Sequence, residues 1–309
     1  MSKIELFNED CIAGMQTRIA DESIHLTVTS IPFEELFTYS GKLEDVGNNG
    51  STVDIRKGRF ALNLRFVIEQ LFRVHKPGSN CAIHIQQLLA WKNQHGFIGR
   101  RDFRGAVIEL FSAGGFNFTG EFAIAKNPQM MAQRLNLHSL MFITGKRNAQ
   151  MLAPAPNDYV LIFQKPGEPE FPVRALYDKD INPSGWVTTE EWIRDASGIW
   201  KDINEIDVLD GYRAARESDE EKHVCPLQLT VIRRLIKLYS NPVSIQPDST
   251  VLDPFMGIGS TAFVAIEQDR NAVGFELKES YYSQSLRNVE IARENKKQAD
   301  NSLFTEATV

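Results

Sequence analysis

The sequence Asp-Pro-Phe-Met-Gly-Ile-Gly-Ser-Thr, residues 253–261, is the most informative stretch of this 309-residue chain. A β-branched run over 250–252 precedes it and predicts a strand, whereas residues 260–268 have a helical pattern and 271–275 predict another strand. The two glycines let the backbone approach a ligand and expose N–H groups at the start of the helix. The order strand, turn, helix, strand indicates an α/β sheet with a ligand over the carboxyl ends of its strands.

An acidic residue, Glu276, closes the second of these strands, 23 positions after Asp253. A carboxylate at that place can accept hydrogen bonds from both hydroxyls of a ribose. A phosphate-binding loop is disfavoured because no Gly-Lys-Ser/Thr follows, and the dinucleotide pattern Gly-x-Gly-x-x-Gly is not completed, since Phe263 lies four positions after Gly259. The stretch therefore favours a nucleoside cofactor that has no pyrophosphate.

The rest of the chain extends the same alternation. Residues 24–29 predict a buried strand that ends at the loop Ser30-Ile31-Pro32-Phe33. We expect a helix over 63–75, a strand over 81–85, a helix over 104–113 and a strand over 116–125. From 127 to 221 the alternation fades, although 159–163 predicts one strand that joins the main sheet. A helix is expected over 226–239, and the polar tail after Asn295 is expected to be frayed.

These motifs resemble those of the DNA amino-methyltransferases, in which Asp-Pro-Phe-x-Gly-x-Gly-Ser/Thr and a strand-terminal Glu bind S-adenosylmethionine. The catalytic loop of that family reads Ser/Asp/Asn-Pro-Pro-Tyr/Phe, and Ser30-Ile31-Pro32-Phe33 is similar to it except that Ile31 replaces the first proline. Asn8-Glu9-Asp10-Cys11 is similar to an opening Gly-Asp-Cys, and His223-Val224-Cys225-Pro226 to a His/Lys-Pro segment. The order of the loops matches the permuted β group over nearly the whole chain. More narrowly, residues 37–40, 47–48 and 255–259 resemble phage and prophage modification methylases.

The resemblance implies a Rossmann-like, doubly wound methyltransferase sheet with an inserted target-recognition region. Residues 1–126 are expected to form the catalytic half, 127–222 the insert and 223–309 the cofactor-binding half. The implied reaction is methyl transfer from S-adenosylmethionine to the exocyclic amino group of a flipped-out base in DNA. A leading Ser in the catalytic loop favours N4 of cytosine, and N6 of adenine remains the alternative.

The resemblance also implies roles for individual residues. Ser30 Oγ and the backbone carbonyl of Ile31 would accept from the amino group, while Phe33 would stack on the base and Pro32 would shape the loop. Cytosine-carbon methylation, which needs a thiolate, is disfavoured because Cys225-Pro226 reverses the usual Pro-Cys and begins a helix. The expected cofactor-binding residues are Asp10, Cys11, His223, Asp253, Pro254, Phe255, Gly257, Gly259, Ser260, Thr261, Glu276 and Leu277.

Charge and composition constrain the partners. The net charge of −6 argues against bulk electrostatic coating of nucleic acid but allows a local basic patch. The cysteines Cys11, Cys81 and Cys225 are too widely separated for a zinc site, so no metal is expected. Trp186, Trp192 and Trp200 are expected to pack, with a wedge role as the alternative. The candidates for DNA contact are Arg56, Lys57, Arg134, Lys146 and Arg147, together with Arg59, Arg100, Arg101 and Arg104.

Double-stranded DNA is the expected substrate, and we also consider a homodimer and a restriction-enzyme counterpart as partners. No apolar run approaches the roughly 20 residues that span a bilayer, so we expect a cytoplasmic protein of a bacterial or phage-infected cell. Two alternatives stay open. Because of Ile31, the chain could be a catalytically silent DNA-binding or decoy protein that retains the cofactor fold. It could also methylate RNA or a small molecule, because the cofactor motif is shared more widely than the substrate.

Overall fold

The structure is a computed structural model of the chain. It describes residues 2–33, 46, 55–173, 187–211, 215 and 226–306, without the side chains of 302–306. Three residues named above, His223, Cys225 and Trp186, lie outside the described residues, as do the resembling segments 37–40 and 47–48.

Within the described part of the chain, the main sheet has eight strands in the order β1-β10-β9-β2-β3-β7-β6-β8. The pairs from β1 to β3 are all parallel, β7 is antiparallel to both of its neighbours, and β8 is parallel to β6. The first residue of β7 therefore lies at the edge where the neighbouring strands end. The strands are β1 (Ile4–Phe7), β2 (Ile24–Ser30), β3 (His75–Gln86), β6 (Asn117–Ile124), β7 (Asp158–Gln164), β8 (Ile199–Trp200), β9 (Thr250–Asp253) and β10 (Asn271–Phe275).

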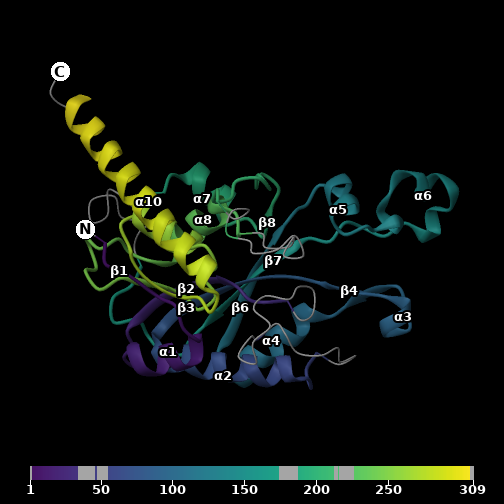
Figure 1. Cartoon of the computed structure of the whole chain (residues 1–309), viewed down its shortest axis with the longest axis horizontal. Coiled ribbons are helices and arrows are strands. Elements are labelled where there is room, and N and C mark those ends of the chain that lie inside the picture. Colours follow the sequence, from purple (N-terminus) through teal and green to yellow (C-terminus); the bar gives the residue numbers. More distant parts are fainter. Residues whose placement is uncertain are drawn as a thin grey trace.

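Helices cover both faces of the sheet, as Figure 1 shows. One apolar cluster joins the sheet to α1 (Cys11–Arg18), α2 (Arg59–Val74) and α4 (Phe103–Ala113). The other joins it to α8 (Leu229–Tyr239), α9 (Ser260–Glu267) and α10 (Glu279–Glu306). The buried positions of α2, which include Leu64, Val67, Ile68 and Leu71, recur at the helical period and explain why one face meets the sheet. The expected doubly wound α/β architecture is confirmed.

Most predicted elements are present with shifted ends. The strand over 271–275 is confirmed as β10, and the strand over 159–163 is confirmed as part of β7, which joins the main sheet. The helix expected from 226 begins only at Leu229. The prediction of a frayed tail after Asn295 is wrong, because α10 continues to Glu306 and no Gly or Pro occurs within it to end it. The helix α10 spans 28 residues but is polar. Among the described residues, no helix is both long enough and apolar enough to cross a membrane.

Two arms extend from the main sheet to the same side of the molecule, at the right of Figure 1. The hairpin arm, residues 88–101, consists of β4 (Leu88–Ala90), α3 (Lys92–His95) and β5 (Gly99–Arg101), with β4 and β5 paired as a separate antiparallel sheet. The helical arm, residues 128–152, contains α5 (Pro128–Arg134), η1 (His138–Leu140), α6 (Phe142–Arg147) and η2 (Ala149–Met151). The expected insert 127–222 thus contains this arm, β7, α7 (Thr189–Asp195) and β8.

Candidate active site

The catalytic motif, residues 30–33, and the cofactor motif, residues 253–261, meet where the strand order of the sheet reverses. From β2 the chain continues outward to β3, whereas from β9 it continues outward in the opposite direction to β10. The carboxyl ends of parallel strands on the two sides of such a switch point leave a crevice in which ligands bind in α/β proteins. Ser30 ends β2 and begins the catalytic loop, residues 30–33, whereas Asp253 ends β9 and begins the cofactor loop, residues 253–261. The two loops therefore flank this point.

Asp253 joins the two loops. One of its carboxylate oxygens, Oδ1, accepts from Thr29 Oγ1 at 2.6 Å and from the backbone N–H of Phe255 at 3.1 Å. The other, Oδ2, accepts from Thr261 Oγ1 at 2.7 Å. Burial raises the pKa of Asp253 to about 6, and these hydrogen bonds offset part of the shift. The carboxylate therefore fixes the cofactor loop to β2 and to the start of α9. A direct contact of Asp253 with a cofactor stays a prediction.

The glycines of the cofactor loop adopt conformations that other residues avoid. Gly257 has φ +53° and Gly259 has φ +88°. A Cβ atom on Gly259 would lie 3.0 Å from the Cβ of Ser285 on α10, whereas a Cβ on Gly257 would meet nothing within 4 Å. The space beside Gly257 is therefore open, as a loop that admits a ligand requires. Pro254, Ser260 and Thr261 are buried beneath the loop, and Phe255 is half-buried.

Glu276 follows β10 and contacts the cofactor loop. Its Oε2 accepts from the backbone N–H of Gly257 at 3.0 Å, and its Oε1 accepts from that of Lys278 at 2.7 Å. Burial raises the pKa of Glu276 to about 7, and these two N–H donors lower it only in part. Each carboxylate oxygen retains a second lone pair, so both oxygens can still accept from ribose hydroxyls. Leu277, the next residue, is half-buried.

The loop after β1 completes this side of the site. Asn8 Nδ2 donates to the backbone carbonyl of Glu276 at 2.8 Å. Asp10 is the N-cap of α1 and accepts from the N–H groups of Ile12 and Ala13 at 3.0 and 2.9 Å. Cys11 is buried in the core, where burial raises the pKa of its thiol far above the usual range. The structure thus brings the loops after β1, β9 and β10 together, as the sequence predicts.

A chain of polar side chains begins at Ser30. In the sheet, Ser30 of β2 is the register partner of His84 of β3, and Ser30 Oγ lies 2.9 Å from His84 Nδ1. His84 Nε2 lies 3.2 Å from Asp158 Oδ2, at the start of β7. Lys126 Nζ lies 2.6 Å from the same oxygen, and the side chains of Lys126 and Asp158 are only 3% and 10% exposed. We call Ser30, His84, Asp158 and Lys126 the relay.

The chemistry of the relay residues determines which atoms donate and which accept in its hydrogen bonds. The Asp158 carboxylate only accepts, so the neutral form of His84 carries its proton on Nε2 and presents a bare Nδ1 to Ser30. The Ser30 hydroxyl then donates to His84 and has lone pairs left to accept another hydrogen bond. Although burial opposes ionisation of Asp158, the hydrogen bonds from His84 and Lys126 and the charge of Lys126 lower the pKa of Asp158 overall. The relay can therefore withdraw a proton from a group bound at Ser30.

The remaining residues of the catalytic loop are mostly buried. Ile31 is 2% exposed and packs in the apolar cluster shared with α1, α2 and α4, which accounts for an isoleucine at this place. Pro32 is buried, and Phe33 is half-buried. The Phe33 ring lies edge-on to His84 and to Phe103, with centroids 6.3 and 6.2 Å apart. Phe33 therefore lies beside the relay, and its stacking on a base stays a prediction.

The predicted DNA-contacting residues are spread over separate elements. Arg56 pairs with Glu109 at 2.5 Å and Asp102 at 3.2 Å, and Arg134 pairs with Glu205 at 3.5 Å, so acidic neighbours already balance their charges. Lys57 is exposed just before α2. Lys146 and Arg147 are exposed on α6, where Lys146 Nζ lies 4.9 Å from the centre of the Phe142 ring.

The tryptophans differ in their environment. Trp200 is buried, stacks on Phe122 with ring centroids 4.4 Å apart, and donates from Nε1 to the carbonyl of Asp195 at 3.1 Å. The expected packing role is confirmed for Trp200. Trp192 is 41% exposed.

Sequence reasoning missed three members of the relay. His84 could have been found, because it lies in the predicted strand 81–85 and parallel strands end at one edge. Lys126 and Asp158 could not have been found from the sequence, because only the antiparallel pairing of Ile124 of β6 with Asp158 of β7 brings these two residues together.

Comparisons with known proteins agree with this geometry. A family model described as DNA methylase, for the N6- and N4-specific enzymes, matches residues 24–287. The Type II methyltransferase M.MjaI of Methanocaldococcus jannaschii is 27% identical over 286 residues, which cover 87% of this chain and 86% of that protein. M.BglI of Bacillus subtilis is 34% identical over 134 residues, 43% of this chain and 30% of that protein.

Solved structures share the fold over nearly the whole chain. A protein of Thermus thermophilus, named as a DNA modification methylase and complexed with S-adenosyl-L-methionine, has a TM-score of 0.63 at 20% identity and covers 94% of this chain and 96% of its own. The cytosine-N4-specific PvuII DNA methyltransferase has a TM-score of 0.60 at 18% identity, with 96% and 93% covered.

Proposed function

Because this chain belongs to the DNA methylase family of N6- and N4-specific methyltransferases, we propose that it methylates N4 of a cytosine flipped out of duplex DNA. As a member of the family it is a methyltransferase, and S-adenosylmethionine is its methyl donor. The observation that carries the choice of an amino group is the relay, which starts at Ser30 and lies beside the cofactor loop.

The residues at the switch point suit this donor. When bound, S-adenosylmethionine supplies an activated methyl group on a sulfonium. Glu276 would accept from the ribose hydroxyls, and the open space at Gly257 leaves room for the ligand against the loop. Asp10, whose carboxylate caps α1, lies in the loop that Asn8 ties to Glu276. The fit rests on a half-buried carboxylate acceptor, Glu276, and an unobstructed glycine, Gly257, which are features of a nucleoside site.

The relay explains how an aromatic amine can be made to react. The amine is a poor nucleophile because its lone pair is delocalised into the ring. In the proposed reaction, Ser30 Oγ accepts a hydrogen bond from the amino group, which favours a tetrahedral nitrogen. As the nitrogen gains its methyl group it must lose one proton, which passes to Ser30 Oγ while the Ser30 proton passes to His84 Nδ1. Asp158 stabilises the resulting imidazolium.

One further feature supports cytosine as the base. The leading residue of the catalytic loop is a hydroxyl, Ser30, which in the resembled family favours cytosine over adenine. Phe33, on the same loop as Ser30, lies next to His84 of β3, where its ring can stack on an extruded base of either kind. Adenine N6 remains the second candidate.

The test is methyl transfer from labelled S-adenosylmethionine to unmodified duplex DNA, followed by mass spectrometry of the nucleosides. We expect N4-methylcytosine from the wild type and a rate that falls about 10²–10⁴-fold in Ser30→Ala, with cofactor affinity unchanged. Product N6-methyladenine would overturn the choice of base and leave DNA methylation intact. Cofactor binding without any labelled DNA would overturn the proposed activity and favour the silent or RNA-directed alternatives.

A further inference from the structure

The two arms differ in charge from the rest of the chain. The hairpin arm contains Lys92, Arg100 and Arg101, the helical arm contains Arg134, Lys146 and Arg147, and neither arm contains a single Asp or Glu. Because the whole chain carries −6 and the arms together carry +6, the remaining residues carry −12. Basic residues concentrated on two arms of an acidic protein create a local surface for an anionic partner.

Both arms lie close in sequence to residues of the relay and the catalytic loop. His84 lies four positions before the hairpin arm, and Phe103, which contacts the ring of Phe33, lies two positions after it. The helical arm lies between Lys126 and Asp158, whose ion pair at 2.6 Å closes its base. A ligand held by the arms is therefore held next to the catalytic loop.

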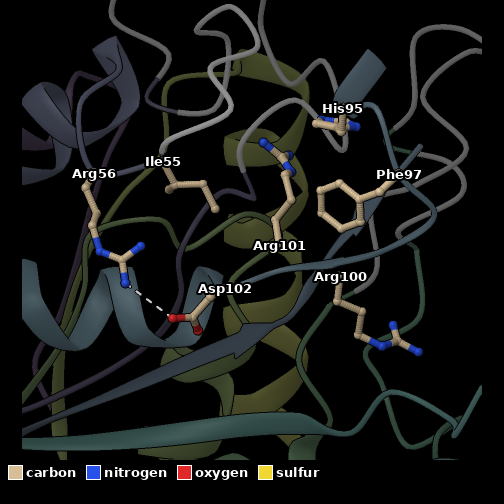
Figure 2. Close-up of a pocket in the computed structure, with 7 residues that line it drawn as sticks. All are labelled: Ile55, Arg56, His95, Phe97, Arg100, Arg101 and Asp102. Atoms are coloured by element: carbon tan, nitrogen blue, oxygen red, sulfur yellow. Dashed lines mark hydrogen bonds and ion pairs between the residues drawn. The ribbon is translucent and has the colours of Figure 1, made fainter. Parts of the chain in front are cut away.

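The bases of the two arms are joined. Arg100 of the hairpin arm donates from Nη2 to the backbone carbonyl of Pro154, just beyond the helical arm, at 3.0 Å. Figure 2 shows Arg100 and Arg101 pointing to opposite sides of β5, with Arg101 turned toward Ile55 and His95 in a pocket of about 200 Å³. Arg100 thus connects the bases of the two arms, and its guanidinium is engaged by the carbonyl of Pro154.

The outer parts of the arms expose apolar side chains as well as these cations. Phe142 is 79% exposed and Ile98 is 75% exposed. Lys146 lies against the Phe142 ring, and Lys92 is exposed on α3. A protein partner would favour an apolar surface depleted in lysine. Apolar side chains flanked by Lys and Arg are instead typical of proteins that contact phosphates and insert a side chain between bases.

We propose that the two arms together bind duplex DNA beside the catalytic loop. Lys92 of the hairpin arm and Lys146 and Arg147 of the helical arm contact phosphates, while Ile98 and Phe142 contact the bases and stabilise the gap left by the extruded nucleotide. The proposal rests on the proposed function, and it places one of the two DNA-binding arms outside the expected insert 127–222.

The charges are tested by the salt dependence of binding. Fluorescence anisotropy of a labelled mixed-sequence duplex, with S-adenosylhomocysteine present, gives the affinity at several salt concentrations. We expect the slope of log affinity against log salt to fall by about 0.9 in Lys92→Ala and by about twice that in the double variant Lys146→Ala, Arg147→Ala. The matched control Lys297→Ala, an exposed lysine on α10, should keep the wild-type slope.

The apolar side chains are tested by methylation rate. Phe142→Ala and Ile98→Ala should keep the salt slope but slow the methylation of a matched duplex by about an order of magnitude. A mismatch at the target base should restore much of that rate, because an unpaired base needs less help to leave the stack.

The outcomes separate this proposal from the proposed function. If the wild type methylates DNA and all the charge variants keep its slope and affinity, the arms do not bind DNA and only this proposal fails. If only the helical-arm variants respond, the role of the hairpin arm is overturned. If the wild type binds the cofactor but neither binds nor methylates duplex DNA, the proposed function fails first.

Discussion

Burial raises the pKa values of single carboxylates in this site, and the raised pKa of Glu276 predicts that cofactor affinity depends on pH. Its pKa is raised to about 7, so below pH 7 the cofactor-free protein holds a neutral carboxyl, which is a poorer acceptor for two ribose hydroxyls. Binding in the charged form must then release a proton. We expect the dissociation constant of S-adenosylmethionine to rise about tenfold per pH unit below 7 and to be flat above it. Isothermal titration across pH checks this, and Glu276→Gln should bind weakly with no such slope.

The relay depends on a second buried charge. Lys126 and Asp158 form an ion pair away from water, and removing one partner leaves the other uncompensated. Lys126→Met should lower the free energy of unfolding by about 3–5 kcal/mol, measured by urea denaturation. The double variant Lys126→Met, Asp158→Leu should recover part of that loss, because neither charge remains. A loss in the double variant equal to the sum of the losses in Lys126→Met and Asp158→Leu would show that the pair is not coupled.

Among the elements, α1 is positioned by a glycine that faces the end of β10. A Cβ on Gly14 would lie 2.3 Å from Cε1 of Phe275, the residue before Glu276. Gly14→Ala should therefore move α1 and destabilise the protein by about 1–3 kcal/mol, with weaker cofactor binding as Glu276 shifts. Gln16→Ala, on the exposed face of the same helix, is the control. Unchanged urea midpoints in both variants would contradict this packing.

The helices and strands also show which parts of the fold the sequence can predict. The strands over 24–29 and 271–275 and the cofactor loop follow from β-branched runs and glycines, which are local signals. The extension of β3 back to His75, through Pro77 and Gly78, depends on the pairing of His75 with Ile24 of β2 and on the hydrogen bond from the Gly78 N–H to the carbonyl of Lys165, which no local pattern contains. The relay has the same origin, because its four members come from four segments that meet only in the sheet.

At the scale of the molecule, the helical arm is separable from the sheet. The two apolar clusters on the faces of the sheet include none of its residues. Replacing residues 128–156 by a short Gly/Ser linker should leave a folded protein that binds S-adenosylmethionine within a few-fold of the wild type but no longer methylates DNA. Circular dichroism and cofactor titration check the first part, and labelled methyl transfer checks the second. A variant that fails to fold would make the arm part of the core.

The ion pair between Lys126 and Asp158 also has an evolutionary consequence. The gene can exchange the DNA between the codons of Lys126 and Asp158 without altering the catalytic sheet. The incoming segment needs only to begin at a lysine and end at an aspartate that form the same ion pair. Under the DNA-binding role proposed for the helical arm, recombination at those codons would give offspring proteins that keep the sheet and the relay but contact a different stretch of DNA.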